Sequence, residues 1–189
     1  IVPHSDGSGV IDQVGTGVPK KRIGERVWIY CGQWERAHGT AAEYISIRAN
    51  HAIPLPDNIK LMSGACLGIP AVTAHRALFT DGSLKNLTVL VTGGAGAVGN
   101  YAIQLAKWGG AERVITTCSS PEKENQAKAA GADLVINYKE EDVSAKIMDA
   151  TDGQGVDRIV EVAFGINLPS TVALLKDNGI ISAYASDIE

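Results

Sequence analysis

Three glycines with the spacing Gly94-x-Gly96-x-x-Gly99 carry the clearest chemical signal in the sequence. They follow the apolar run 87–91, which has the character of a strand buried on both faces, and they precede apolar residues with helical spacing. In such a turn the first glycine permits a tight bend, the second lets the backbone approach a pyrophosphate, and the third packs the helix against its strand. The unpaired amides of the helix then face the phosphates, so the pattern predicts a dinucleotide-binding turn. The alternative is a turn with a purely structural role.

Two other glycine-rich sites are disfavoured. A mononucleotide P-loop would need Gly-Lys-Ser or Gly-Lys-Thr after the glycines, and neither is present. A short-chain dehydrogenase would need a further glycine at Ala97 and a Tyr-x-x-x-Lys motif, and the sequence has neither.

The residues after the second strand of this unit favour NADPH over NADH. An NAD site would place a carboxylate about 20 residues beyond the glycines to bind the ribose hydroxyls. The sequence has Ser119, Ser120 and Lys123 there instead, and hydroxyls with an ammonium suit a 2′-phosphate. Ser120 also has the features of a helix cap, with Pro121 at the first helical position and Glu122 in the first turn. Both roles are compatible.

These residues need a scaffold, and the second part of the chain supplies a regular one. Alternating patterns predict strands at 87–92, 113–117, 134–137, 156–162 and 179–184, and helices at 97–108, 121–130, 142–150 and 167–176. Strands that alternate with helices form parallel crossovers, so we expect an α/β fold with a doubly wound parallel sheet.

The first 57 residues read differently, because short alternating runs at 9–14, 26–30 and 42–47 predict an all-β segment. So few strands leave uncovered edges, so this β domain looks incomplete. Residues 61–78 predict two short helices separated near Gly68-Ile-Pro70.

Composition and charge narrow the classes of partner that the protein could bind. The 189 residues are 45% hydrophobic and carry a formal net charge of −4, which argues against nucleic acid or an anionic membrane as a partner. Three widely spaced cysteines, Cys31, Cys66 and Cys118, suggest neither a disulfide framework nor a structural zinc site, and reduced thiols fit a cytoplasmic protein. The chain begins with Ile1 rather than methionine, so we expect it to be a piece of a longer protein.

Short motifs along the whole chain resemble the medium-chain dehydrogenase/reductase superfamily, in particular its zinc-independent quinone oxidoreductase branch, to which zeta-crystallin belongs. The matching stretches are DGSGVI at 6–11, GERV at 24–27, GTAAEY at 39–44, PAVTAH at 70–75, the glycine turn, GAD at 131–133 and VINY at 135–138. The resemblance implies a partial GroES-like β domain at 1–57, a helical bridge at 58–86 and a Rossmann domain at 87–189 that lacks its C-terminal part.

The resemblance also implies a set of cofactor-binding residues, with the nicotinamide between the two domains. Thr73 would lie near the nicotinamide, and Tyr138 near the adenosine end, where a rim aromatic without a ligand role is the alternative. The whole implied set is Thr73, Gly94, Gly96, Ala97, Val98, Gly99, Ser119, Ser120, Lys123, Tyr138, Val162, Ala163, Tyr184, Ala185 and Ser186.

Departures from the zinc enzymes of the superfamily shape the expected reaction. Ser5 and Asp6 stand where those enzymes have a His-Glu pair that supplies a ligand, and Ile69 stands where they have a ligand cysteine. Cys66 lies three residues earlier and reads as a small core residue, so we expect no metal. Without a Lewis acid, easily reduced acceptors such as quinones or enones are favoured, and catalysis would rest mainly on positioning.

No residue is identified as a catalytic acid or base. The four histidines are interpreted as surface or capping residues, and only Asp6 and Tyr44 are polar residues of interest in the β domain.

Two alternatives to a quinone oxidoreductase are kept, an enoyl-thioester reductase on the same scaffold and a nucleotide-binding module without turnover. The resemblance further implies segments before Ile1 and beyond Glu189 that complete the acceptor site, and a homodimer in the full-length protein, for which the last predicted strand offers a free edge.

Overall fold

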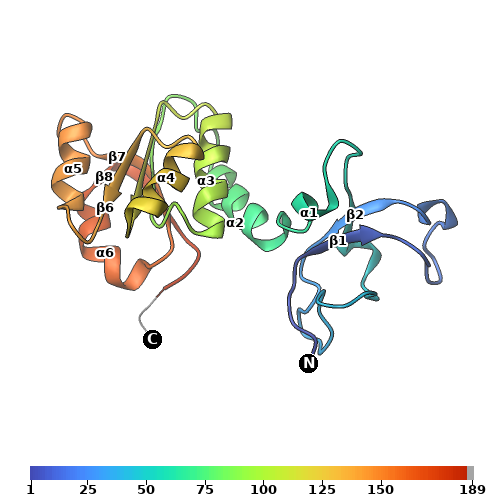
Figure 1. Ribbon diagram of the computed structural model, residues 1–189. Helices are drawn as coiled ribbons and strands as arrows, with labels where there is room; N and C mark the ends of the chain where they lie inside the picture. Colours follow the sequence, from blue (N-terminus) through green and yellow to red (C-terminus); the bar gives the residue numbers. More distant parts are fainter. Residues whose placement is uncertain (187–189) are drawn as a thin grey trace. The chain divides into compact units, whose positions relative to one another are not determined.

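The computed structural model describes residues 1–186, and the chain divides into two compact units, Ile1–Val72 and Thr73–Glu189 (Figure 1). The first unit contains a small antiparallel sheet and the second a parallel sheet with helices. The expected fold class, a partial GroES-like β domain followed by a doubly wound α/β sheet, is confirmed. The last three residues of the predicted 87–189 domain lie outside the described part. Within residues 1–186, no helix has the length and apolar character needed to span a membrane.

The β unit is built on three short strands, β1 (Gly7–Val10), β2 (Arg26–Ile29) and β3 (Ala52–Pro54), paired antiparallel in that order. Two single turns of 3₁₀ helix, η1 (Lys20–Arg22) and η2 (Ala49–His51), lie between them. The strand predicted at 9–14 is shorter and lies earlier in the chain. Strand β1 begins at Gly7, two residues before the predicted start, and ends at Val10.

The prediction of a strand at 42–47 is wrong. Ile45 and Ile47 are half-buried whereas Tyr44 and Ser46 are exposed, so the alternation does reflect burial on one side. A strand also needs a neighbour with which to form a hydrogen-bonded ladder, and this segment pairs with none of the described strands.

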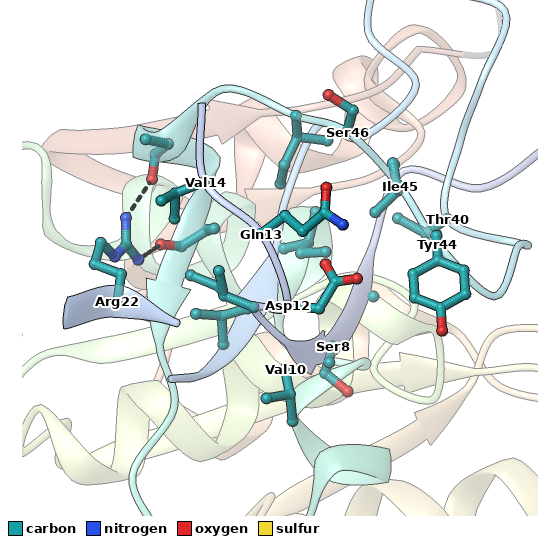
Figure 2. Close-up of a pocket in the computed structure, with 18 of the residues that line it drawn as sticks. Ser8, Val10, Asp12, Gln13, Val14, Arg22, Thr40, Tyr44, Ile45 and Ser46 are labelled. Carbon is teal, nitrogen blue, oxygen red and sulfur yellow. Dashed lines mark hydrogen bonds between the residues drawn. The ribbon is translucent and has the colours of Figure 1, made fainter. Parts of the chain in front are cut away.

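A hollow of about 940 Å³ lies against the β unit's sheet (Figure 2). Its lining mixes polar and apolar residues and comes from β1, β2 and the unpaired segments around Val14 and Ile45. None of the predicted cofactor-binding residues lines it. Its one arginine, Arg22, is already engaged by Glu25 and by the carbonyls of Ala49 and Ala52, so the hollow does not offer a cation suited to phosphates.

Two helices follow, α1 (Leu61–Gly64) and α2 (Gly68–Phe79), as predicted, but the predicted position of the break at Gly68-Ile-Pro70 is wrong, because these residues form the first turn of α2. The break precedes Gly68, and a carboxylate from the β unit sits at the start of α2. Asp6 Oδ1 accepts a hydrogen bond from the Ile69 amide at 2.8 Å, and a Cβ on Gly68 would collide with that carboxylate. Burial raises the pKa of Asp6, and the Ile69 hydrogen bond opposes the shift. Asp6 therefore caps α2.

The second unit is a five-stranded parallel sheet in the order β6-β5-β4-β7-β8. Its elements are β4 (Thr88–Val91), α3 (Ala97–Trp108), β5 (Arg113–Cys118), α4 (Pro121–Ala129), β6 (Leu134–Asn137), α5 (Val143–Ala150), β7 (Val156–Glu161), α6 (Phe164–Ala173) and β8 (Leu175–Ala183). The predicted alternation of strands and helices is confirmed throughout, and β8 forms one edge of the sheet.

The last two elements begin earlier than predicted. Helix α6 begins at Phe164 because its first amides find partners beyond β8: Phe164 N donates to Ala185 O at 3.2 Å and Gly165 N to Ser186 Oγ at 3.2 Å. Strand β8 begins at Leu175 because its pairing with β7 continues across an irregularity near Asn178, whose φ is 61°.

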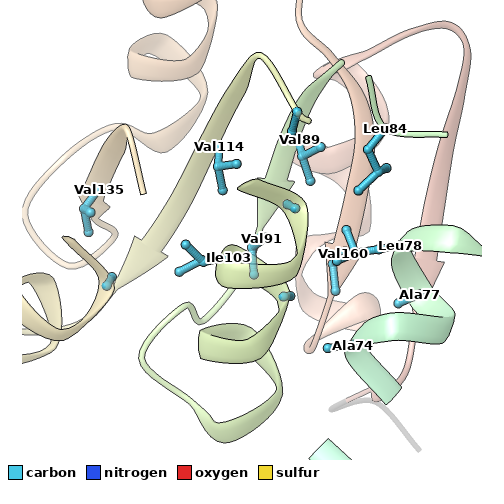
Figure 3. Close-up of a cluster of buried hydrophobic side chains, with 14 of the residues drawn as sticks. Ala74, Ala77, Leu78, Leu84, Val89, Val91, Ile103, Val114, Val135 and Val160 are labelled. Atoms are coloured by element: carbon cyan, nitrogen blue, oxygen red, sulfur yellow. The ribbon is translucent and has the colours of Figure 1, made fainter. Parts of the chain in front are cut away.

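Successive residues along the strands face opposite sides of the sheet and enter two different cores. The first core joins Val89, Val91, Val114, Val135 and Val160 to α2, α3 and α4 (Figure 3). The second joins the intervening residues Leu90, Ile115, Ile136 and Ile159 to α5 and the end of α6. Helices therefore cover both faces, as a doubly wound sheet requires.

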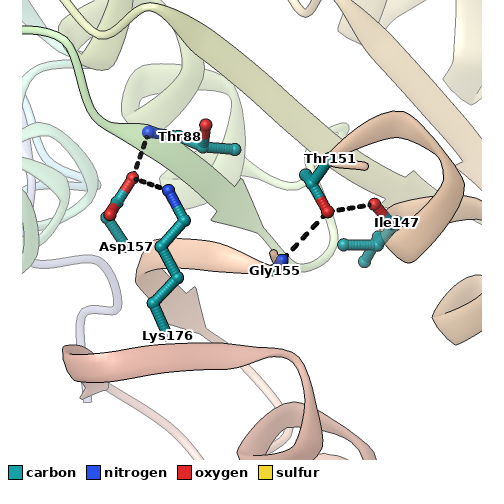
Figure 4. A network of polar contacts seen from close by, with 6 residues as sticks. All are labelled: Thr88, Ile147, Thr151, Gly155, Asp157 and Lys176. Carbon is teal, nitrogen blue, oxygen red and sulfur yellow. Dashed lines mark hydrogen bonds and ion pairs between the residues drawn. The ribbon is translucent and has the colours of Figure 1, made fainter. Parts of the chain in front are cut away.

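The amino ends of the central strands are held by fixed polar contacts (Figure 4). Asp157 Oδ2 accepts hydrogen bonds from Thr88 N at 2.7 Å and from Lys176 Nζ at 3.0 Å, which joins β4, β7 and β8. Thr151 Oγ1 donates to Ile147 O at 2.8 Å and accepts from Gly155 N at 3.0 Å, which fixes the turn that leads into β7.

Candidate functional site

The strand order creates a switch point between β4 and β7. The chain moves outward from β4 through β5 to β6 and then returns to β7 on the other side of β4, so the connections after β4 and β7 leave in opposite directions. Ligands of such sheets bind at the carboxyl ends of the strands beside this point. Apart from Thr73, all the predicted cofactor residues of the second unit lie beyond the carboxyl ends of its strands. They are in the connections that leave these strands or in the first turns of the helices that come next.

The bend after β4 is at Gly93, not at Gly94 as predicted from the spacing. Gly93 has a φ of 68°, whereas Gly94 is not in the left-handed region. The Gly93 amide donates to Thr117 Oγ1 at 3.1 Å and the Gly94 amide to Thr117 O at 3.0 Å. Gly94 is required for packing instead, because a Cβ there would collide with Thr116 Oγ1 and lie 2.7 Å from Ile103 Cδ1.

The two remaining glycines shape the start of α3. A Cβ on Gly99 would collide with the carbonyl oxygen of Gly93 and lie 2.9 Å from its carbon, so Gly99 lets the helix pack against the turn. Gly96 is the exposed N-cap residue, and no side chain caps the helix there. The first turn, which includes Ala97 and Val98, carries no acidic residue. Its free amides and the positive dipole end suit an anion.

Two serines and a lysine come together beyond β5. Lys123 Nζ donates to Ser119 Oγ at 3.0 Å, and Ser120 Oγ accepts from the Lys123 amide at 3.4 Å. The helix-capping interpretation of Ser120, with Pro121 at the first position, is confirmed. The Ser120 hydroxyl lowers the pKa of the neighbouring Glu122. The structure therefore gathers two hydroxyls and an exposed ammonium at one strand end.

Tyr138 follows β6, and its backbone is tied to the end of β5. Its amide donates to Cys118 O at 3.1 Å, and its side chain is 53% exposed. The backbone of the preceding residue is also fixed, because the Asn137 amide donates a hydrogen bond to Glu141 Oε2 at 2.9 Å. The ends of β5 and β6 thus share one surface.

The loops after β7 and β8 are tied to each other and to the glycine turn. Ala163 N donates to Glu161 Oε1 at 2.7 Å, and Val162 N donates to Thr92 Oγ1 at 2.9 Å. The Tyr184 amide donates to Glu161 O at 3.0 Å. Burial, with a contribution from the Glu161 charge, raises the pKa of the Tyr184 phenol to about 12, so this hydroxyl stays protonated at neutral pH.

Three functional candidates were missed by the sequence reasoning. Gly93 was passed over because Gly94 fits the expected spacing equally well. Thr92 carries no distinctive signal. Glu161 does carry one, because it is a carboxylate at the carboxyl end of a strand whose other buried residues are mostly apolar.

The remaining predicted positions lie outside this arrangement. Thr73 is on α2, at the start of the second unit, and its role stays a prediction. The prediction that Cys66 is a core residue is wrong: it is exposed, and its Sγ donates to Met62 O at 3.5 Å. Tyr44 is 76% exposed. In residues 1–186, no group of three or more His, Cys, Asp or Glu side chains is arranged to hold a metal ion.

Comparison with known proteins agrees with this architecture. Residues 1–57 match the family model of the alcohol dehydrogenase GroES-like domain, and residues 97–187 match that of zinc-binding dehydrogenases. A quinone oxidoreductase from Rattus norvegicus is 35% identical over 178 residues, which are 94% of this chain and 53% of that protein. The chain thus spans about half the length of the curated relatives it matches.

Two solved structures show the same arrangement. A quinone oxidoreductase from Pseudomonas syringae superposes with a TM-score of 0.81 at 27% identity, covering 98% of this chain and 57% of that one. A mycobacterial protein complexed with NADPH superposes with a TM-score of 0.83 at 30% identity, covering 96% of this chain and 56% of that one.

A doubly wound sheet with a glycine turn at its switch point, preceded by a GroES-like β unit, defines the class of Rossmann-fold dehydrogenases and reductases. Within that class, the chain belongs to the medium-chain dehydrogenase/reductase superfamily, in its quinone oxidoreductase branch.

The packing at the glycine turn is testable by adding single methyl groups. We expect Gly94→Ala and Gly99→Ala each to lower the free energy of unfolding by about 2 kcal/mol or more, because the added Cβ meets Thr116 or the Gly93 carbonyl. Gly9→Ala is the control, since a Cβ there meets nothing within 4 Å, and its effect should stay within about 1 kcal/mol. Urea unfolding followed by circular dichroism measures all three; equal stability of Gly9→Ala and Gly99→Ala would contradict the assigned packing.

Proposed function

We propose that this chain is the NADPH-binding core of a zinc-independent oxidoreductase that passes hydride to a quinone or a similar conjugated acceptor. The observation that carries the proposal is the pairing, on neighbouring strand ends, of an uncapped glycine turn at the start of α3 with the Ser119, Ser120 and Lys123 group. The quinone oxidoreductases to which the chain is similar support the same activity. A cytoplasmic location remains our prediction.

The residues present fit a dinucleotide. The amides of Ala97, Val98 and Gly99 would receive the pyrophosphate, because the helix has neither a capping side chain nor an acidic first turn. When bound, the reduced nicotinamide supplies the hydride. We propose that Val162 and Ala163, together with Tyr184, Ala185 and Ser186, border the nicotinamide half, with Thr73 approaching it from α2.

The choice of NADPH rests on the end of β5. The strand ends in Cys118, so no carboxylate is placed there to bind the ribose hydroxyls of NAD and repel a 2′-phosphate. Ser119 and Lys123 offer a hydroxyl and an ammonium 3.0 Å apart. We propose that they hold the 2′-phosphate, with Tyr138 over the adenosine end.

The residues at the expected zinc-ligand positions do not fit a metal. Ser5 and Asp6 replace the His-Glu pair, and the Asp6 carboxylate is committed to the Ile69 amide at 2.8 Å. Ile69 itself has no ligand atom in its side chain. The match to zinc-binding dehydrogenases begins at residue 97 and includes none of these positions. We therefore propose catalysis by positioning, for acceptors that take hydride without a Lewis acid.

Cofactor specificity is testable at Lys123. We expect Lys123→Ala to weaken NADPH binding about tenfold, which corresponds to about 1.4 kcal/mol, and to leave NADH binding unchanged. Calorimetric titration of the 189-residue chain with each nucleotide measures both. Lys128→Ala is a matched control, because Lys128 lies on the same helix but pairs with Glu124 at 2.6 Å. Equal loss of NADPH affinity in both variants would mean that only the general charge of α4 matters.

The reaction is testable by following NADPH absorbance with a quinone, an enone or an enoyl thioester as acceptor. We expect oxidation with the quinone and no increase on adding zinc. Faster oxidation with the thioester would replace the proposal by the enoyl reductase. Tight NADPH binding without oxidation by any acceptor would favour a nucleotide-binding module.

We further propose that the protein assembles as a homodimer through the open edge of β8, which pairs only with β7 among the described strands. Analytical ultracentrifugation over a range of concentrations should show a dimer. A charged substitution on the exposed residue Ala183 should shift it to monomer. A species that remains monomeric at high concentration would overturn this proposal.

A further inference from the structure

Glu161, the last residue of β7, is a fully buried carboxylate in a sheet whose interior is otherwise mostly apolar. Its Oε1 atom accepts three hydrogen bonds, from Thr92 Oγ1 at 2.8 Å, Ala163 N at 2.7 Å and Asn167 Nδ2 at 2.9 Å. Its Oε2 atom is buried and has no hydrogen-bond partner. All the hydrogen bonds recorded for the carboxylate therefore converge on one oxygen.

This arrangement is costly for stability. Burying a carboxylate is unfavourable unless it is well paired, and here the three donors are a hydroxyl, an amide and a carboxamide, with no cation among them. A buried oxygen without a partner adds a further desolvation cost. A buried group of this kind calls for a role other than packing.

The three donors show what Glu161 joins. Thr92 lies between β4 and the glycine turn, Ala163 lies in the loop after β7, and Asn167 lies in the first half of α6. Strands β4 and β7 pair only as far as Val91 and Val160, and beyond that point their connections leave in opposite directions. The Glu161 carboxylate joins the two diverging connections by hydrogen bonds. Thr92 adds a second link between them, because its Oγ1 accepts a hydrogen bond from Val162 N at 2.9 Å.

We infer that Glu161 is a positioning residue, which holds the glycine turn and the loop after β7 at the separation required by the pyrophosphate and nicotinamide part of the cofactor. The inference rests on the proposed function. Because Oε2 is buried, Glu161 acts through Thr92 and Ala163 and does not touch the cofactor. Its effect is confined to one half of the ligand, since the Ser119 and Lys123 group lies beyond β5, on the other side of β4.

That confinement gives a test that separates positioning from general loss of structure. The 189-residue chain and its variants are titrated calorimetrically with NADPH and with adenosine 2′-monophosphate, which contains the adenosine and its 2′-phosphate but neither the pyrophosphate nor the nicotinamide. We expect Glu161→Ala to weaken NADPH binding about tenfold or more and to leave binding of adenosine 2′-monophosphate within about twofold. Glu161→Gln keeps an acceptor oxygen for all three donors, so it should restore most of the NADPH affinity.

A second pair of variants tests the same contact from the other side and guards against poor folding of Glu161→Ala. Thr92→Val removes the hydroxyl with little change in shape and should reproduce the selective loss of NADPH affinity, whereas Thr92→Ser should resemble the parent. An equal loss of both ligands, or no loss of NADPH affinity in either Glu161→Ala or Thr92→Val, would overturn the inference. A parent chain that binds neither ligand would overturn the proposed function itself, and the inference with it.

Discussion

The second unit depends on the close approach of α3 to the turn that precedes it. At Gly99 the backbone of the helix lies so near the Gly93 carbonyl that a single methyl group has no room. This contact fixes where the helix starts and leaves its first amides without a cap. Because those amides are the natural partners of an anion, a packing constraint between two glycines determines what the start of α3 can bind.

Binding at the proposed site would be divided between two kinds of donor. The amides of α3 are neutral, belong to the backbone and would serve any nucleotide with a pyrophosphate. Lys123 is a full charge on a flexible side chain, held 3.0 Å from Ser119, and would distinguish nucleotides that carry a further phosphate. In this proposal affinity and selectivity fall to different strands, so that one could change without the other.

The alternation of strands and helices in the second unit could be predicted because each element has a strong period and a clear boundary. Segment 42–47 failed because alternation reports burial on one side and says nothing about whether a partner strand exists. Gly93 and Gly94 could not be told apart because Thr117, far along the chain, decides which one bends. Glu161 could have been noticed as a carboxylate at a strand end, but its role could not be predicted, since its partner Thr92 lies 69 residues away in the sequence.

The contacts of Asp157 at the amino ends of β4, β7 and β8 have a consequence for how such a protein can diversify. They brace the sheet at the end away from the connections that carry the proposed nucleotide-binding residues. Exposed side chains in those connections, such as Lys123, can therefore change with little penalty for folding, whereas the packed glycines Gly94 and Gly99 cannot, and a change at Asp157 would disturb three strands at once. New ligand preferences are accessible on this scaffold through such exposed side chains, because the Asp157 contacts that join three strands lie at the opposite end of the sheet.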